Sequence, residues 1–453
     1  MKVAVVGSSH GGYEAVRGVL QQFPDAHIDW YEKGDFISFL SCGMELYLQG
    51  VVKDVNSVSY ATIPEMEDKG VHVHINSEVT NIDPDGHKLT VVDVQNGQEE
   101  SADYDKLILS VGATPFKLPV AGKELQNIYA MRGRDWAIKL REAEVKPDIK
   151  NVTVVGSGYI GIEAAESFAK AGKHVTIVDT NPTILGTYLD TEFTEILEEE
   201  LKANDVDLRL SQSVKEYVGN SDDKVTSVIS TTGDTWDADL VIETAGIRPA
   251  TKWLAGIVDL DDHGMIKTDE YQQTSNPDIF AVGDATEIEF APTGKKQLIA
   301  LASNARRQGR SAAANLEGHK RKTTAVSGSS ALHVFNYKFA STGVKDVTAE
   351  GLGVDVESVF VTDTKVPPFV PAEHNAEVFF KLTYDPKTRV VMGAQIMSKM
   401  DTTANINAIS LAIQQHMTVD DLAYADFFFQ PGFDRPWNIM NVAAQKAEQK
   451  LDK

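Results

Sequence analysis

The chain has 453 residues, a globular composition with 42% hydrophobic and 24% charged residues, and a formal net charge of −23. This length predicts roughly three domains, because single hydrophobic cores stop growing well below it. The negative charge repels phosphate backbones and anionic headgroups, which excludes nucleic acid and membrane surfaces as expected partners. No apolar run approaches the roughly 18 residues that a membrane-spanning helix needs.

The chain opens with the pattern of a parallel βαβ unit. Lys2–Val6 is expected to form a buried strand, Gly7–Gly12 a tight turn, Tyr13–Phe23 a helix and His27–Glu32 a second strand. Because the first residues run straight into a strand, we expect no signal peptide. The single cysteine permits no internal disulfide and suits a reducing compartment, so the sequence predicts a cytoplasmic protein.

The first turn resembles a dinucleotide-binding turn with one departure. Ser9 stands where the second glycine of the GxGxxG pattern belongs, while Gly7 and Gly12 keep the outer glycines. Glu32 ends the following strand and offers a carboxylate to ribose hydroxyls. We interpret the turn as a dinucleotide site; a purely structural turn is the alternative.

The same plan starts again near residue 151. A strand, Asn151–Val155, leads into a complete GxGxxG at Gly156–Gly161, a helix at Ile162–Ala171 and a strand at His174–Asp179. The glycines let a pyrophosphate approach the backbone at the helix N-terminus, and Asp179 is placed to accept ribose hydroxyls. That carboxylate repels a 2′-phosphate, and no arginine follows it, so the site is expected to prefer NADH to NADPH.

Two later regions complete the organisation. Thr274–Asp284 reads as a strand ending in Gly-Asp, where Asp284 could meet the ribityl hydroxyls of a flavin before a helix that faces its phosphates, or could simply cap that helix. From about Val326 the pattern becomes α+β. The expected elements are strands at Leu332–Ser341, Val356–Thr362, Glu377–Tyr384 and Arg389–Ser398, and a helix at Thr402–His416.

Together these motifs resemble the pyridine nucleotide-disulfide oxidoreductases, which are similar to glutathione reductase. The segments Leu109–Pro115 and Ile242–Pro249 match the places where the family's chain crosses between domains. The resemblance implies an α/β fold with two Rossmann-like dinucleotide-binding domains, for FAD and NADH, and a C-terminal α+β dimerisation domain. The implied boundaries are 1–115 and 250–325 for FAD, 116–249 for NADH and 326–453 for the interface of a homodimer or homotetramer.

The resemblance also implies two cofactor sites. The FAD site comprises Gly7, Ser9, His10, Gly11, Gly12, Glu32, Lys33, Cys42, Ser110, Gly112, Ala113, Arg132, Gly283, Asp284 and Ala302. The NADH site comprises Gly156, Gly158, Tyr159, Ile160, Gly161, Asp179, Tyr188 and Gly246. Tyr159 matches an aromatic gate that covers the flavin until NADH displaces it; a packing role is the alternative. No metal site is predicted.

Cys42 is the only cysteine, although most members of the family carry a pair. It stands where the family places its flavin-facing sulfur, and a helix-like stretch follows, which predicts a lowered thiol pKa. Without a second cysteine, the sulfur can cycle between thiolate and sulfenic acid or form a mixed disulfide with a small thiol. A lone cysteine is otherwise a small buried hydrophobe.

A single cysteine indicates the branch of NADH peroxidases, water-forming NADH oxidases and coenzyme A disulfide reductases. The segments most similar to the peroxidases are Gly7–Ala15, Trp30–Cys42 and Tyr424–Pro431. The resemblance makes His10 and Glu14 an acid/base pair with Arg306 beside them. A capping histidine and a plain Glu14–Arg306 ion pair are the alternatives.

The sequence thus predicts an NADH peroxidase that reduces hydrogen peroxide to water through FAD and Cys42. A water-forming NADH oxidase, which uses oxygen, is the alternative hypothesis, and a coenzyme A disulfide reductase is a less favoured third one. A redox sensor without turnover would have no use for a hydride donor site. Phe427–Phe429 is expected to be interface core, although in the family this segment reaches the partner's active site.

Overall fold

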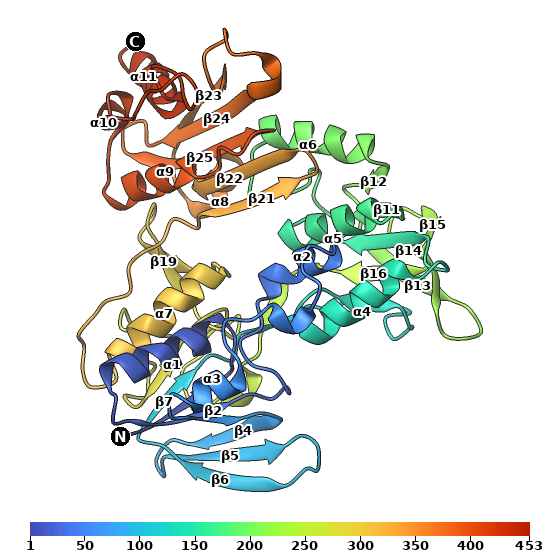
Figure 1. Cartoon of the computed structure of the whole chain (residues 1–453), viewed down its shortest axis with the longest axis vertical. Coiled ribbons are helices and arrows are strands. Elements are labelled where there is room, and N and C mark those ends of the chain that lie inside the picture. Colours follow the sequence, from blue (N-terminus) through green and yellow to red (C-terminus); the bar gives the residue numbers. More distant parts are fainter.

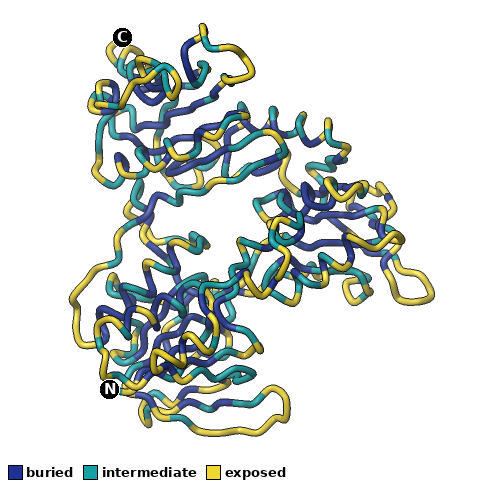
Figure 2. The backbone as a smooth tube through the Cα atoms, viewed as in Figure 1, coloured by how far each residue is buried: buried dark blue, intermediate teal, exposed yellow.

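The computed structural model describes residues 1–453 and forms three lobes, each built around its own sheet (Figure 1). Two lobes have parallel five-stranded sheets and the third has an antiparallel one, which confirms the predicted α/β class with a C-terminal α+β domain. In Figure 2 the strands at the centre of each lobe are buried, while exposed segments gather in the loops. No helix has the length and apolarity to cross a bilayer.

The first lobe has a parallel sheet in the order β18-β7-β1-β2-β3. Its strands are β1 (Lys2–Val6), β2 (His27–Tyr31), β3 (Val71–His74), β7 (Lys106–Leu109) and β18 (Ile279–Ala281). Because β18 pairs with β7, with Ile279 opposite Leu107, segments far apart in sequence share one sheet. This pairing supports our proposal that 1–115 and 250–325 are two parts of one domain.

Two helices cover one face of that sheet, and they pack unusually close to each other. They are α1 (His10–Gln22) and α7 (Ala302–Ala314). A Cβ added at Gly309 would lie 2.4 Å from the Gly11 carbonyl oxygen, and one at Gly18 would lie 2.6 Å from the Ala313 Cβ. Glycines therefore allow the helices to touch, and this contact places Glu14 beside α7.

The remaining elements of the lobe lie around this core. They are α2 (Met44–Leu48), α3 (Ile63–Glu67), the antiparallel strands β4 (Ser77–Asp83), β5 (Lys88–Asp93) and β6 (Glu99–Asp103), and the hairpin β19 (Ile288–Phe290) and β20 (Lys295–Gln297). Two short strands, β8 (Ala113–Pro115) and β17 (Ile247–Pro249), pair antiparallel where the chain crosses to and from the second lobe.

The second lobe repeats the first one's plan, with a parallel sheet in the order β12-β11-β10-β16-β9. Its strands are β9 (Ile128–Ala130), β10 (Asn151–Val155), β11 (His174–Val178), β12 (Val206–Arg209) and β16 (Leu240–Glu243). Its helices are α4 (Arg134–Val145), α5 (Tyr159–Lys170) and α6 (Thr191–Ala203), and β13 (Val214–Gly219), β14 (Val225–Ser230) and β15 (Thr235–Asp237) form a small antiparallel sheet.

The C-terminal lobe has an antiparallel sheet in the order β21-β22-β25-β24-β23. Its strands are β21 (Ser330–Val334), β22 (Tyr337–Gly343), β23 (Glu357–Thr364), β24 (Glu377–Tyr384) and β25 (Val391–Ser398). Its helices are α8 (Asp346–Leu352), α9 (Asn405–Gln414), α10 (Val419–Ala423) and α11 (Ile439–Leu451).

The prediction of one strand at Leu332–Ser341 was wrong, because β21 and β22 form a hairpin there. The turn falls at Phe335, which has a φ of 48° although no glycine or proline marks the position. Its backbone N–H donates to the Glu166 carboxylate at 3.0 Å, and the next backbone N–H donates to Glu200 at 3.3 Å. Carboxylates of the second lobe therefore hold a turn that local sequence does not indicate.

An ionic cluster joins the three lobes close to this turn. His333 Nε2 on β21 lies 3.1 Å from carboxylate oxygens of both Glu45 on α2 and Glu166 on α5. Glu166 is fully buried and also pairs with Lys170. Hydrogen bonds to the two carboxylates raise the pKa of His333 to about 10. The protonated histidine therefore ties the Cys42-bearing segment to the other two lobes.

Substituting His333 with glutamine should lower the midpoint of thermal unfolding by a few degrees at neutral pH, since it removes the cation that contacts both carboxylates and leaves Glu166 with Lys170 alone. A histidine whose folded pKa is raised stabilises fully below its ordinary pKa of 6.5 and loses that contribution as pH rises through about 10. The difference between wild type and variant, measured by calorimetry, should therefore shrink from about pH 6 to about pH 10. A constant difference would show that the charge is irrelevant.

Candidate active site

The first glycine turn has no room for side chains. Gly7 has a φ of 97°, and a Cβ there would lie 2.2 Å from the Ser110 carbonyl oxygen. A Cβ at Gly12 would lie 1.9 Å from the carbonyl oxygen of Gly7. Below the turn, Glu32 accepts hydrogen bonds from the backbone N–H of Ser8, at 3.1 Å, and from its hydroxyl. The carboxylate is thereby fixed at the end of β2, where a nucleotide ribose would lie.

The second turn repeats this geometry almost atom for atom. Gly156 has a φ of 104°, and a Cβ at Gly161 would lie 2.0 Å from the Gly156 carbonyl oxygen. Asp179 accepts from the backbone N–H of Ser157 at 2.6 Å and from its hydroxyl at 2.7 Å, while Asn181 N–H reaches its other oxygen at 2.8 Å. Both turns therefore fit a dinucleotide, one in each lobe.

The departure at Ser9 has a structural explanation. Ser9 precedes α1 with φ −76° and ψ −158°, and the equivalent Gly158 precedes α5 with φ −74° and ψ −175°. Both conformations are extended backbone that any residue adopts. Glycine at this position is therefore not required by the backbone, and serine leaves the turn intact.

Asp284, which belongs to the predicted FAD site, follows strand β18. Its carboxylate pairs with Arg132 at 2.8 Å, and Gly283 N–H donates to the Gln308 side chain at 2.9 Å. The expected helix directly after Asp284 is absent, because a turn and strand β19 follow and the next helix, α7, begins at Ala302. The N-terminus of α1, rather than a helix after Asp284, therefore faces the first glycine turn.

Other predicted site residues have simple positions. Lys33 is exposed and pairs with Glu78 at 2.7 Å. Tyr188 stacks on Tyr159, with ring centroids 4.0 Å apart, and the Tyr159 hydroxyl lies 2.6 Å from the Ser330 hydroxyl on β21. Gly112 and Gly246, with φ of 62° and 108°, adjoin the crossing strands β8 and β17, and Ala113 begins β8.

Cys42 lies in a single 3₁₀ turn, Ser41–Gly43, immediately before α2. Its surface is accessible, but protein surrounds it on most sides, and this desolvation raises the thiol pKa. The charges of Glu163 and Asp284 raise it further, whereas Arg132 lowers it. The predicted lowering is therefore wrong for this structure, since α2 is only five residues long and its end is a weak counter-charge.

Backbone hydrogen bonds join the cysteine segment to a second loop. Ser38 N–H donates to the Ser8 carbonyl at 3.0 Å, so the segment is tied to the first glycine turn. The buried Ser38 hydroxyl donates to the Ala61 carbonyl at 2.8 Å and accepts from the Ala61 N–H at 3.0 Å. Tyr60 N–H also donates to the Ser38 carbonyl at 3.2 Å. These bonds hold Tyr60 beside the cysteine segment.

Tyr60 contacts two of the predicted catalytic residues, His10 and Arg306. Its hydroxyl lies 3.0 Å from His10 Nδ1, and the Arg306 guanidinium lies 4.6 Å from its ring centroid. The Tyr13 ring stacks on the Tyr60 ring with centroids 5.1 Å apart, and the Arg306 guanidinium also lies 5.8 Å from the Tyr13 centroid. Burial lowers the pKa of His10, with Arg306 and Arg132 adding to the effect and Asp284 opposing it. The histidine is therefore neutral near neutral pH.

Glu14 does not orient His10 as the acid/base interpretation requires. Its buried carboxylate instead accepts from Arg306 at 2.7 and 3.2 Å, and lies 3.0 Å from Arg310 and 3.5 Å from Arg17. The ion-pair alternative describes its contacts. Glu14 therefore fixes Arg306, and Tyr60, which sequence reasoning missed, orients the histidine.

Glu163 is a second group that sequence reasoning missed. It lies on α5 one turn beyond Tyr159, and its carboxylate has no ion-pair partner. Burial, reinforced by Glu45 and Glu166, raises its pKa to about 8, although His333 opposes the shift. The i,i+4 spacing from Tyr159 was the available signal, because it places both residues on one helix face.

Two dinucleotide turns on α/β lobes, with one accessible thiol between charged groups, define a nicotinamide-dependent oxidoreductase. Residues 1–309 match the family model for pyridine nucleotide-disulphide oxidoreductases, and residues 329–439 match the dimerisation domain of that family. The chain belongs to this family. It is an NADH-dependent flavin oxidoreductase, with FAD and NADH as its cofactors.

Relatives match the chain along its whole length. It is 42% identical to an NADH oxidase of Enterococcus faecalis, covering all of both chains, and 33% identical to an NADH oxidase of Lactococcus lactis, covering 99% and 100%. The solved water-forming NADH oxidase of Lactobacillus brevis, bound to NADH, superimposes with a TM-score of 0.96 at 36% identity, covering 100% of this chain and 99% of that one.

Proposed function

We propose that this enzyme is an NADH peroxidase that reduces hydrogen peroxide to water at Cys42. The observation that carries the proposal is the convergence on Tyr60, whose backbone N–H donates to Ser38 of the cysteine segment, whose hydroxyl lies against His10 and whose ring faces Arg306. A neutral histidine and a fixed guanidinium suit a small, polar, uncharged acceptor. The similarity of Gly7–Ala15 and Trp30–Cys42 to the peroxidases supports the same assignment.

In the proposed reaction, the Cys42 thiolate attacks one peroxide oxygen. The S–O bond forms as the O–O bond breaks, leaving cysteine sulfenic acid and hydroxide. When Nδ1 of neutral His10 accepts from the Tyr60 hydroxyl, Nε2 carries the proton and can donate a hydrogen bond to the departing hydroxide, which takes up a solvent proton to become water. FAD, when bound at the first glycine turn, would supply the two-electron relay from NADH, and with those electrons the sulfenic acid would return to thiolate and release a second water. The sum is NADH, a proton and peroxide converted to NAD⁺ and two waters.

Glu163 has a defined electrostatic part in this scheme. Below its pKa of about 8 the carboxyl is neutral and does not oppose the Cys42 thiolate. Above that pH its charge adds to that of Asp284 and disfavours the thiolate. We therefore infer that neutral Glu163 weakens the electrostatic opposition to the thiolate near neutral pH, although desolvation still raises the pKa of the Cys42 thiol.

The alternative is a water-forming NADH oxidase, and the activities named for the Enterococcus, Lactococcus and Lactobacillus relatives favour it. Oxygen would then be the first acceptor, and Cys42 would reduce the peroxide formed from it. The Tyr60–His10–Arg306 arrangement serves both reactions, since both pass through peroxide at the thiolate.

The acceptor is tested by following NADH oxidation of the FAD-loaded enzyme at 340 nm. One reaction contains hydrogen peroxide in anaerobic buffer, and the other contains air without added peroxide or catalase. We expect turnover at least about tenfold faster with peroxide. Faster turnover in air, with two NADH consumed per oxygen, would instead establish the oxidase.

A further inference from the structure

A cavity of about 420 Å³ lies between α7 and the extended segment 321–326, and neither Cys42 nor His10 lines it. This volume falls in the range of small-molecule sites, roughly 300 to 1,000 Å³. Its lining is dominated by cations: Arg306, Arg307, Arg310, Arg321 and Lys322. Glu14 is the only acidic residue in the lining, although the chain as a whole carries a net charge of −23.

These cations are incompletely neutralised. Arg306 and Arg310 share the single carboxylate of Glu14. Arg307 donates only to the amide oxygen of Asn304, at 3.2 Å, and Arg321 has no carboxylate partner. Lys322 pairs with Glu270 at 2.7 Å, but both side chains are more than half exposed, so this pair is weak. The cavity therefore has an excess of positive charge.

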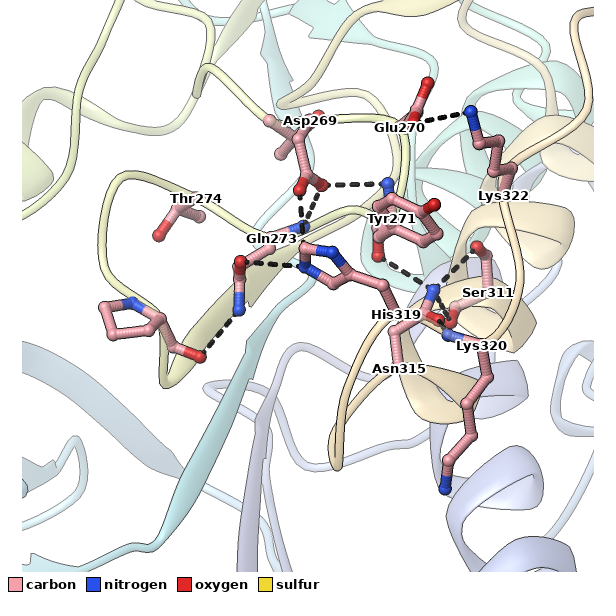
Figure 3. Close-up of polar contacts among 12 residues, drawn as sticks. Asp269, Glu270, Tyr271, Gln273, Thr274, Ser311, Asn315, His319, Lys320 and Lys322 are labelled. Carbon is pink, nitrogen blue, oxygen red and sulfur yellow. Dashed lines mark hydrogen bonds and ion pairs between the residues drawn. The ribbon is translucent and has the colours of Figure 1, made fainter.

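Hydrogen bonds hold the backbone of the wall that carries Arg321, and Figure 3 shows the residues Asn315, Ser311 and Lys320 that take part in them. Asn315, 1% exposed at the end of α7, accepts from the backbone N–H groups of Lys320 and Arg321 at 2.8 and 2.9 Å. Its amide donates to the carbonyl oxygens of Tyr271, at 3.1 Å, and Arg321, at 2.8 Å. The buried Ser311 hydroxyl also donates to the Arg321 carbonyl, at 3.1 Å. Because the backbone is already ordered, a ligand would lose little affinity to ordering this wall.

We propose that this cavity is a binding site for a compact polyanion of the phosphate class, separate from both dinucleotide sites. One guanidinium group can donate two parallel hydrogen bonds to two oxygens of the same phosphate, which explains why the lining has more arginine than lysine. The lining has no aromatic ring on which a nucleobase could stack, and hydroxyls and one amide supply its other polar groups. These features favour inorganic pyrophosphate or the phosphate ester of a small polyhydroxy compound over a nucleotide.

Binding in this cavity would affect the predicted active site through Arg306, which belongs to both sites. Arg306 lines the cavity, pairs with Glu14 and lies over the Tyr60 ring. An anion that drew Arg306 or Arg310 away from Glu14 would shift the guanidinium that faces Tyr60. The site is thus placed to modulate turnover, whichever acceptor the enzyme uses.

The test is titration calorimetry of the FAD-loaded enzyme with sodium pyrophosphate and, separately, a hexose 6-phosphate. Saturating NAD⁺ keeps the second dinucleotide site occupied, and the unphosphorylated hexose and sodium chloride at equal ionic strength serve as ligand controls. We expect saturable binding of at least one phosphate compound. The tighter of the two identifies an inorganic or an ester ligand.

Variants then locate the binding. Arg307→Gln and Arg321→Gln should each weaken it about tenfold or more, because each removes a charge-assisted contact. Lys320→Gln is the matched control, since its ammonium lies 5.4 Å from the Phe23 ring centroid and does not line the cavity. Equal weakening in all three variants, an effect of salt alone, or no saturable binding would overturn the proposal. Unchanged flavin content and melting temperature exclude misfolding.

Discussion

Replacing Cys42 with serine should leave the reduction of bound FAD by NADH intact while peroxide-dependent NADH oxidation falls at least about a thousandfold. The serine hydroxyl is not ionised near neutral pH and forms no reversible S–O bond, so the electrons have no route to peroxide. The nucleotide turns are untouched, because Cys42 makes no side-chain hydrogen bond to either of them. Stopped-flow absorbance at about 450 nm measures the first half-reaction and steady-state NADH loss measures the second.

Ser41→Ala is the matched control, because Ser41 shares the 3₁₀ turn and its side chain makes no hydrogen bond. It should turn over peroxide like wild type. Peroxide turnover retained in Cys42→Ser would contradict the sulfenic acid scheme outright. In aerated buffer the same variant discriminates the oxidase, since an enzyme that reduces oxygen would then release hydrogen peroxide instead of water.

The elements best predicted from sequence are those whose boundaries are set locally. Strands β1 and β10 have the predicted bounds, because a buried apolar run ends at a glycine with positive φ in each case. The helices begin three residues earlier than expected, at His10 and Tyr159, since the glycine turn already includes the first helical turn. The hairpin at Phe335 was missed because Glu166 and Glu200, distant in sequence, hold it.

The site was predictable as a set of residues but not as a set of contacts. Cys42, His10, Glu14 and Arg306 stand out by motif, and the structure brings His10 and Arg306 to Tyr60 and pairs Glu14 with Arg306. Tyr60 itself carries no sequence signal, because backbone bonds between two loops determine its position. The raised pKa values of Glu163 and Cys42 likewise depend on burial and on carboxylates from several segments, which no local pattern reveals.

Substituting Asp179 with alanine should weaken the preference for NADH over NADPH by roughly a hundredfold in the ratio of kcat/KM values. The carboxylate is held by Ser157 and Asn181 in a position where its free lone pairs can accept the ribose hydroxyls of NADH. Alanine removes those acceptors, which raises the KM for NADH about tenfold, and it removes the charge that repels a 2′-phosphate. Initial rates with each nucleotide at saturating peroxide measure both effects.

Two further variants separate charge from shape. Asp179→Asn keeps an oxygen that can accept from Ser157 and should show an intermediate ratio, because only the repulsion is lost. Asp207→Asn removes the same charge from the neighbouring strand β12, where Asp207 pairs with Arg209 at 3.0 Å, and should leave the ratio unchanged. If Asp207→Asn shifted the ratio as far as Asp179→Ala, the preference would come from the net charge of the lobe. If Asp179→Ala left the ratio intact, the selectivity would reside elsewhere in the second turn.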